Sequence, residues 1–242
     1  MDSIQPLSER DLQGLILAPV RELRDSIPQL NPSKEFTFHG TTIASFFVEN
    51  GSAVIAVSDG KVSENAMLQA ASLEFKKLIE IDAWTVMAIS GSASFGLLYA
   101  RSLRSWVETM ERIREEPIST RAKVNMLSKI LRDSLPISMG GFAVMPILTV
   151  YDEKRGPRIF LFTPDGSVVT KSEYAISGSG RISEGSLLVG HRRDMTREEG
   201  IEFAKSIVKN ANKMDKATGG RIFIKVVSKE GIESLDGGFI DV

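Results

Sequence analysis

The chain changes character at the run Gly40-Thr41-Thr42-Ile43-Ala44-Ser45-Phe46-Phe47. A polar, weakly patterned segment precedes this run, whereas the small and apolar residues within it suit a buried strand. If the Gly40–Thr41 bond were cut, Thr41 would carry a hydroxyl and a free α-amine on one residue. An α-amine has a pKa of about 7.7–8.0, and a threonine with such an amine is a known pair of nucleophile and base. Gly40 suits this reading because, without a Cβ, it permits the strained turn in which the hydroxyl reaches the preceding carbonyl. The run therefore fits two interpretations, an ordinary strand or a future N-terminus at which Thr41 is a nucleophile with its own base.

The composition is that of a globular protein. The chain has 242 residues, of which 42% are hydrophobic and 25% charged, which suits one domain of ordinary size. It has no cysteine, so a disulfide framework, a thiolate nucleophile and a zinc–thiolate site are excluded. This agrees with a reducing cytoplasm. The net charge of −1 gives no electrostatic reason to expect nucleic acid or an anionic membrane as a partner.

Residues 1–40 read as a leader without the features of a secretory signal. Their start is acidic, and their apolar stretch at 15–20 is short and contains Pro19. No stretch of the chain approaches the ~20 apolar residues of a membrane span. One short helix is predicted by five apolar residues at helical spacing, Leu12, Leu15, Ile16, Val20 and Leu23. We expect residues 41–242 to form one domain, because no repeat or linker divides them.

The patterns after Thr41 predict strands at both ends of this domain, with helices between them. Asn50-Gly51 predicts a hairpin turn, and Thr196 with Glu199 matches a capping box at the start of a helix. The expected strands are 42–48, 53–57, 75–81, 84–89, 142–151, 158–162, 167–175, 221–228 and 231–234. The expected helices run through 97–107, over 120–138, from just after 180 and from about 196. This order predicts an α+β fold in which helices enclose two sheets.

A charged pair is expected close to Thr41. Asp59 ends the second predicted strand, and Lys77 has the parity of the apolar Phe75 and Ile79, which would direct it inward. A buried lysine beside a threonine hydroxyl favours the alkoxide and needs a carboxylate partner. Asp59 is the natural partner for Lys77.

Three small-residue segments complete the set. The run 90–94 offers backbone N–H groups around Gly91, as an oxyanion hole requires. The runs 177–180 and 215–220 supply hydroxyls, a carboxylate and flexible backbone that would orient an α-amine. Each segment alone also fits a plain structural interpretation as a turn, loop, strand face or helix end. Their joint order along one chain favours the catalytic interpretation.

This ordered set resembles a proteasome β-type subunit, most closely the bacterial, actinobacterial type with its propeptide. The matching runs are His39–Ile43, Asp59–Ser63, Lys76-Lys77, Ile89–Gly91, Ser177–Gly180 and Asp215–Gly220. The resemblance covers residues 38–236 and implies the four-layer αββα sandwich of N-terminal-nucleophile hydrolases. It also implies a threonine endopeptidase that hydrolyses peptide bonds of unfolded proteins inside a chamber of stacked rings.

The resemblance assigns roles residue by residue. Residues 1–40 become a propeptide that the chain removes itself at Gly40–Thr41. Thr41 is then the nucleophile, tuned by Asp59 and Lys77, and the Gly91 amide binds the oxyanion. The α-amine is held by Ser179, Asp215 and Thr218.

The resemblance also implies a pocket for the side chain that precedes the cut bond. Its expected lining is Val62, Ser63, Phe75, Ile89, Ala93 and Leu97. Since this lining carries no charge, we expect cleavage after apolar residues. The implied partners are β-type ring neighbours in a heptamer, α-type subunits and, indirectly, an ATPase unfoldase. No cofactor, metal, nucleic acid or membrane is implied.

Two departures and two alternatives accompany this resemblance. The family usually has arginine within two residues after the first aspartate, where this chain has Gly60-Lys61, and the stretch from Asp59 to Lys77 is about two residues longer than usual. The run Asp59–Ser63 is close to the HslV-type subunit, a relative that assembles with a different ATPase. The long leader and the run Asp215–Gly220 argue against that branch. The other alternative is a catalytically silent β-type ring subunit. The presence of Thr41, Asp59 and Lys77 argues against it, because a silent subunit needs none of them.

Overall fold

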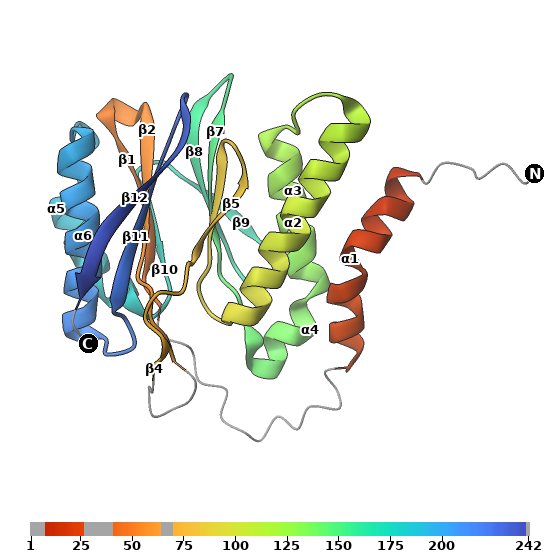
Figure 1. Ribbon diagram of the computed structural model, residues 1–242, viewed down its shortest axis with the longest axis horizontal. Helices are drawn as coiled ribbons and strands as arrows, with labels where there is room; N and C mark the ends of the chain where they lie inside the picture. Colours follow the sequence, from red (N-terminus) through yellow and green to blue (C-terminus); the bar gives the residue numbers. More distant parts are fainter. Residues whose placement is uncertain (1–7, 27–40, 64–69, 241–242) are drawn as a thin grey trace, which may run out of the picture.

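Two antiparallel sheets lie face to face between helices in the structure, a computed structural model that describes residues 8–26, 41–63 and 70–240 (Figure 1). The predicted α+β class is confirmed. Residues 27–40 fall outside the described residues, and with Gly40 so does the predicted cleavage bond.

The first sheet has the strand order β10-β1-β2-β11-β12. Its strands are β1 (Ile43–Val48), β2 (Ala53–Ser58), β10 (Tyr174–Ser177), β11 (Gly220–Ser228) and β12 (Gly231–Ile240). Every residue of β1 and β2 is buried. Alternate side chains face opposite sides of the sheet, and both sides are covered, one by α6 (Arg197–Met214) and the other by the second sheet. Phe46 packs toward the helix layer on one side, and Phe47 packs toward the second sheet.

The second sheet has the order β5-β6-β7-β8-β9. Its strands are β5 (Leu78–Asp82), β6 (Thr85–Ala88), β7 (Ile147–Asp152), β8 (Gly156–Phe162) and β9 (Val168–Lys171). A separate short pair consists of β3 (Val62–Ser63) and β4 (Ala70–Ser72). The two sheets share an apolar core to which both contribute alternate residues, among them Ile43, Ala56, Leu78 and Ile147.

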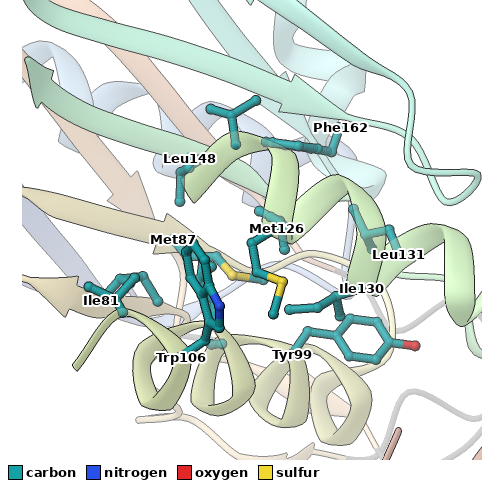
Figure 2. Packing of buried hydrophobic residues seen from close by; sticks show 14 of the residues in the cluster. Ile81, Met87, Tyr99, Trp106, Met126, Ile130, Leu131, Leu148 and Phe162 are labelled. Carbon is teal, nitrogen blue, oxygen red and sulfur yellow. The ribbon is translucent and has the colours of Figure 1, made fainter. Parts of the chain in front are cut away.

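Helices cover the outer face of each sheet. The helices are α1 (Glu9–Ser26), α2 (Ala93–Arg114), α3 (Thr120–Asp133), α4 (Leu135–Ile137), α5 (Glu184–Gly190) and α6 (Arg197–Met214). α6 packs on the first sheet through Ala204, Ile207 and Val208. α2 and α3 pack on the second sheet (Figure 1). Figure 2 shows Trp106 and Tyr99 of α2 directed toward Met126 and Ile130 of α3, with Met87 and Leu148 of the sheet beside them.

The helix predicted in the leader is α1, and it is part of the packed structure. Leu17 and Val20 are each only 1% exposed and belong to the same apolar cluster as buried residues of α2 and α3. Leu15, on the other face of the same helix, is 61% exposed. α1 lies on the far side of the α2–α3 layer from the sheets (Figure 1).

Most predicted elements are found within a few residues of their predicted bounds. The hairpin turn at Asn50-Gly51 has left-handed backbone at Glu49, Asn50 and Gly51, with φ of 53°, 56° and 91°. The capping box is present, since Thr196 Oγ1 accepts from the Glu199 N–H at 3.2 Å and the Glu199 carboxylate accepts from the Thr196 N–H at 2.8 Å.

Three predictions of strands were wrong in detail. The single strand predicted at 167–175 is two strands in different sheets, β9 and β10, and the chain crosses between the sheets at 172–173. The strand predicted from 142 begins at Ile147, because a helical turn occupies 138–142. The strand predicted from 75 begins at Leu78, so Lys77 precedes it and the parity argument does not apply. Leu78 faces the first sheet, while Ile79 packs against the helix-side core.

Candidate active site

The register of β1 and β2 brings Asp59 to Thr41. Ile43 pairs with Ser58, so the start of one strand lies beside the end of the other. The Asp59 N–H donates to the Thr42 carbonyl at 3.1 Å, and the Thr42 N–H donates to Asp59 Oδ1 at 2.9 Å. Thr41 is 3% exposed and Asp59 is fully buried.

Lys77 forms a buried ion pair with Asp59. Its Nζ lies 2.7 Å from Asp59 Oδ1 and also donates to the Lys61 carbonyl at 2.7 Å. Asp59 Oδ2 accepts from the backbone N–H groups of Lys61 and Gly219, both at 3.2 Å. The carboxylate thus has four N–H partners.

These surroundings act on both ionisable groups. Burial raises the pKa of the Asp59 carboxyl, while the charge and hydrogen bond of Lys77 and the backbone N–H groups oppose this shift. Burial lowers the pKa of the Lys77 ammonium, against the attraction of Asp59. Protonating the carboxyl would leave backbone donors without an acceptor. Asp59 and Lys77 therefore form an ion pair, and the Lys77 ammonium loses its proton more readily than that of an ordinary lysine.

On its other side, Thr41 meets a chain of hydrogen bonds that ends at Asp215. The Thr41 N–H donates to Ser179 Oγ at 3.0 Å, and Ser179 Oγ donates to Asp215 Oδ2 at 2.5 Å. Thr218 Oγ1 donates to the same oxygen at 2.9 Å. Since a hydroxyl has only one proton to give, the 2.8 Å contact between Thr42 Oγ1 and Thr218 Oγ1 must be donated by Thr42.

Glycines allow the 177–180 segment to wrap closely around Thr41. Gly178 has φ of 92°, and a Cβ there would lie 2.1 Å from the Thr41 carbonyl oxygen. The Gly180 N–H donates to that oxygen at 3.2 Å, and a Cβ on Gly180 would lie 1.8 Å from Thr42 Oγ1. A side chain at either position would push the segment away from Thr41.

A small pocket opens beside Thr41. Its volume is about 10 Å³, and its lining is Thr41, Val62, Phe75, Lys77, Ile89, Gly91 and Ala93. Four of the six predicted specificity residues are therefore in this lining. Leu97 is not, because it packs against the core beneath α2. The side chain of Ser63 falls outside what is described.

The structure adds residues that sequence reasoning missed. Thr42 bonds to Asp59 through its amide and to Thr218 through its hydroxyl. Lys61 contacts Asp59 and Lys77 through its backbone. The available signals were the second threonine of the Thr41-Thr42 pair and the Gly60-Lys61 departure, but neither identifies these contacts.

Within the described ranges, no group of three or more acidic, histidine or cysteine residues is arranged to hold a metal ion. No helix in that same part of the chain has the length and apolar character needed to cross a membrane.

Comparison with known proteins identifies the family. The model of the family described as "Proteasome subunit" matches residues 37–227. The chain belongs to the proteasome family. It is 30% identical over 219 residues to the proteasome subunit beta of Streptomyces griseus, covering 87% of this chain and 76% of that protein. It is 32% identical over 200 residues to the proteasome subunit beta of Methanocaldococcus vulcanius, covering 82% and 86%.

These relatives identify a proteasome β-type subunit, and actinobacterial proteins are among them. The HslV-type and silent-subunit alternatives are not favoured. Proteasome β subunits are generally peptidases, which makes the chain a hydrolase. Such subunits form stacked rings with α subunits, which supports neighbouring β-type subunits and α-type subunits as partners.

Proposed function

We propose that the chain is a threonine endopeptidase whose nucleophile is Thr41, exposed by self-cleavage of the Gly40–Thr41 bond. The main support is that two groups of residues meet at Thr41. The Lys77–Asp59 ion pair bonds to the neighbouring Thr42 and shares the pocket with Thr41, and the Ser179–Asp215 hydrogen bonds reach the Thr41 nitrogen. Residues 1–40 are then a propeptide and residues 41–242 the peptidase domain, with the four-layer αββα sandwich of N-terminal-nucleophile hydrolases.

In this proposal the reaction uses groups of the chain alone. The Thr41 hydroxyl passes its proton to its own α-amine as Oγ1 attacks the substrate carbonyl. Lys77 stabilises the negative charge that develops on Oγ1, and the Gly91 N–H stabilises the oxyanion. The amine returns the proton to the leaving nitrogen as the C–N bond breaks. Water then hydrolyses the ester and regenerates Thr41.

The remaining residues hold the base and the ion pair in place. Ser179, Asp215 and Thr218 orient the α-amine, whose nitrogen is the amide nitrogen of the uncut chain. Asp59 keeps Lys77 charged and fixed. In self-cleavage the Thr41 hydroxyl attacks the Gly40 carbonyl and gives its proton to a water molecule, because the Thr41 nitrogen is still an amide. That nitrogen takes up the proton and leaves as the α-amine when the C–N bond breaks, and a second water hydrolyses the Gly40 ester to free the hydroxyl.

The decisive test compares Thr41→Ala with Thr41→Ser. The alanine variant is expected to keep the leader and to lack peptidase activity, because the attacking hydroxyl is gone. The serine variant keeps a hydroxyl and is expected to retain part of both activities. Intact-mass measurement and N-terminal sequencing report cleavage, and a fluorogenic peptide reports turnover. Loss of residues 1–40 from the alanine variant without added protease would refute self-cleavage.

Substrate preference is proposed from the pocket. Val62, Phe75, Ile89 and Ala93 offer no countercharge, so a charged substrate side chain would lose hydration without compensation. An apolar side chain would gain about 1.5–3 kcal/mol on burial, or roughly tenfold to a hundredfold discrimination. The water-sized volume of the pocket means that its lining must move to admit a side chain, which favours medium-sized residues. A panel of peptides that differ only at the residue before the cut bond tests this. Preference for Arg or Asp would show that the pocket is wrongly assigned.

The proposed assembly is a heptameric ring of these subunits stacked on α-type rings in the cytoplasm. An ATPase unfoldase would deliver polypeptide substrates to the chamber. This part of the proposal rests on family membership and on a composition without cysteine.

A further inference from the structure

Lys61 is a buried lysine beside the proposed catalytic pair, and the mechanism above gives its side chain no role. It is 4% exposed, and its Nζ donates to the backbone carbonyl of Lys216 at 2.7 Å. Burying an ammonium is costly unless it is hydrogen-bonded. Breaking the hydrogen bond to the Lys216 carbonyl would leave the ammonium buried without this acceptor, so the contact stabilises the folded chain.

The carbonyl that accepts this bond adjoins Asp215. Asp215 ends α6 and begins the 215–219 loop, which also carries Thr218. At its far end the loop is tied to the turn after β2 by backbone groups, since the Gly60 N–H donates to the Gly219 carbonyl at 3.1 Å. The Gly219 N–H in turn donates to Asp59 Oδ2. The Lys61 side chain makes the corresponding tie at the near end, next to Asp215.

The backbone of Lys61 belongs to the other half of the site. Its carbonyl accepts from Lys77 Nζ at 2.7 Å, and its N–H donates to Asp59 Oδ2 at 3.2 Å. Lys61 therefore contacts the Asp59–Lys77 ion pair through its main chain and the 215–219 loop through its side chain. A shift of either half relative to the other would change the Lys61 contacts.

We propose that Lys61 is a positioning residue that fixes Asp215 relative to the Lys77–Asp59 pair. This inference rests on the proposed function, because it assumes that Asp215 orients the Thr41 α-amine. Loss of the tie lets the 215–219 loop move while leaving the Asp59–Lys77 contact in place. Small displacements of catalytic groups lower turnover strongly, by up to about 10²-fold for 1 Å.

The test compares Lys61→Met with Lys61→Arg. The methionine variant keeps much of the side-chain volume but loses the donor, whereas arginine keeps both donor and charge. Lys213→Met is the matched control, because Lys213 is an exposed lysine close to the same loop. The number of working sites is titrated with an irreversible peptide vinyl sulfone, and kcat and KM are measured on a fluorogenic peptide with an apolar residue before the cut bond.

We expect kcat per titrated site to fall about tenfold or more in Lys61→Met. KM should change less than twofold, because Lys61 does not line the pocket. Lys61→Arg should recover most of the loss, and Lys213→Met should match the wild type. A purely structural role would instead reduce the number of titrated sites and leave the turnover of each site unchanged.

Three results would overturn the proposal. The first is an unchanged kcat per site in Lys61→Met. The second is a loss that Lys61→Arg does not reduce. The third is failure of both Lys61 variants to mature, which would mark the residue as structural. The proposed function is judged separately by wild-type protein and Thr41→Ala in the same assay, since activity that survives in Thr41→Ala would refute that function whatever the Lys61 variants do.

Discussion

Asp59 shows how one buried carboxylate can organise a site. It receives N–H donors from the strand pair, from the turn that follows β2, from the 215–219 loop and from Lys77. Three of the four donors are backbone groups, so their positions are set by chain path rather than by rotamers. These contacts fix the Lys77 ammonium, and Lys77 lines the same pocket as Thr41.

Replacing Lys77 by alanine is expected to abolish peptide turnover, because the charge that stabilises the attacking oxygen is lost. It also leaves Asp59 buried without its cationic partner, which typically costs about 3–5 kcal/mol of stability. Turnover per titrated site and chemical denaturation measure the two effects. Lys76→Ala, at the exposed neighbouring position, should change neither. Near-normal hydrolysis by Lys77→Ala would show that another group performs this role.

The pH profile gives a second check on Lys77. Its folded-state pKa is lowered by burial, and in the proposed mechanism the protonated form stabilises the attacking oxygen. Activity should therefore fall with rising pH at a lower pH than an ordinary lysine would impose. In Lys77→Arg any residual activity should lack this alkaline decline, because arginine stays protonated.

The positions of the candidate site residues were partly predictable from the sequence. The order of small-residue and charged runs pointed to Asp59, Lys77, Ser179, Asp215 and Thr218, and the structure gathers all of them around Thr41. The roles of Thr42 and Lys61 depend on backbone atoms and loop contacts, which no residue pattern encodes. The resemblance assigned Leu97 to the pocket, whereas the structure packs it against the core beneath α2.

At the scale of elements, the sequence pattern predicts whether a segment is a helix or a strand better than it predicts which sheet a strand joins. The strand-like segment 167–175 has the same sequence pattern whether one strand continues or the chain passes from one sheet to the other. The structure separates it into β9 and β10, and β10 pairs with β1 and leads directly to Gly178. This crossing between sheets brings Ser179 to Thr41.

The leader helix offers a test of packing at this scale. In the uncleaved Thr41→Ala background, Leu17→Ala is expected to weaken docking of α1 by about 2 kcal/mol or more, because a fully buried leucine is truncated. Hydrogen exchange of the α1 amides should become faster. Leu15→Ala is the matched control, since Leu15 is 61% exposed on the same helix. Equal exchange in the two variants would contradict the docked position of α1.

At the scale of the whole molecule, most apolar side chains of α2 and α3 are buried against other parts of the same chain. Tyr99, Leu103 and Val107 of α2 are fully buried within the single chain, so this face of α2 is core. Exposed apolar residues are also found on a strand edge. β9 is an edge strand of the second sheet on which Val168 and Val169 are 40% and 52% exposed.

An exposed apolar edge strand invites pairing or aggregation unless something covers it. We therefore expect β9 to lie at a subunit contact in the assembled ring. Wild-type protein produced with an α-type subunit should mature and elute as a large complex with rings visible by electron microscopy.

Val169→Lys should reduce the yield of that complex, because it would place an unpaired charge in the contact. Thr170→Lys tests the adjacent exposed position on the same strand and should have a smaller effect, since it removes no apolar contact. Full assembly of Val169→Lys would exclude this edge from the interface, and a wild-type protein that stays monomeric after maturation with its α-type partner present would refute the ring itself.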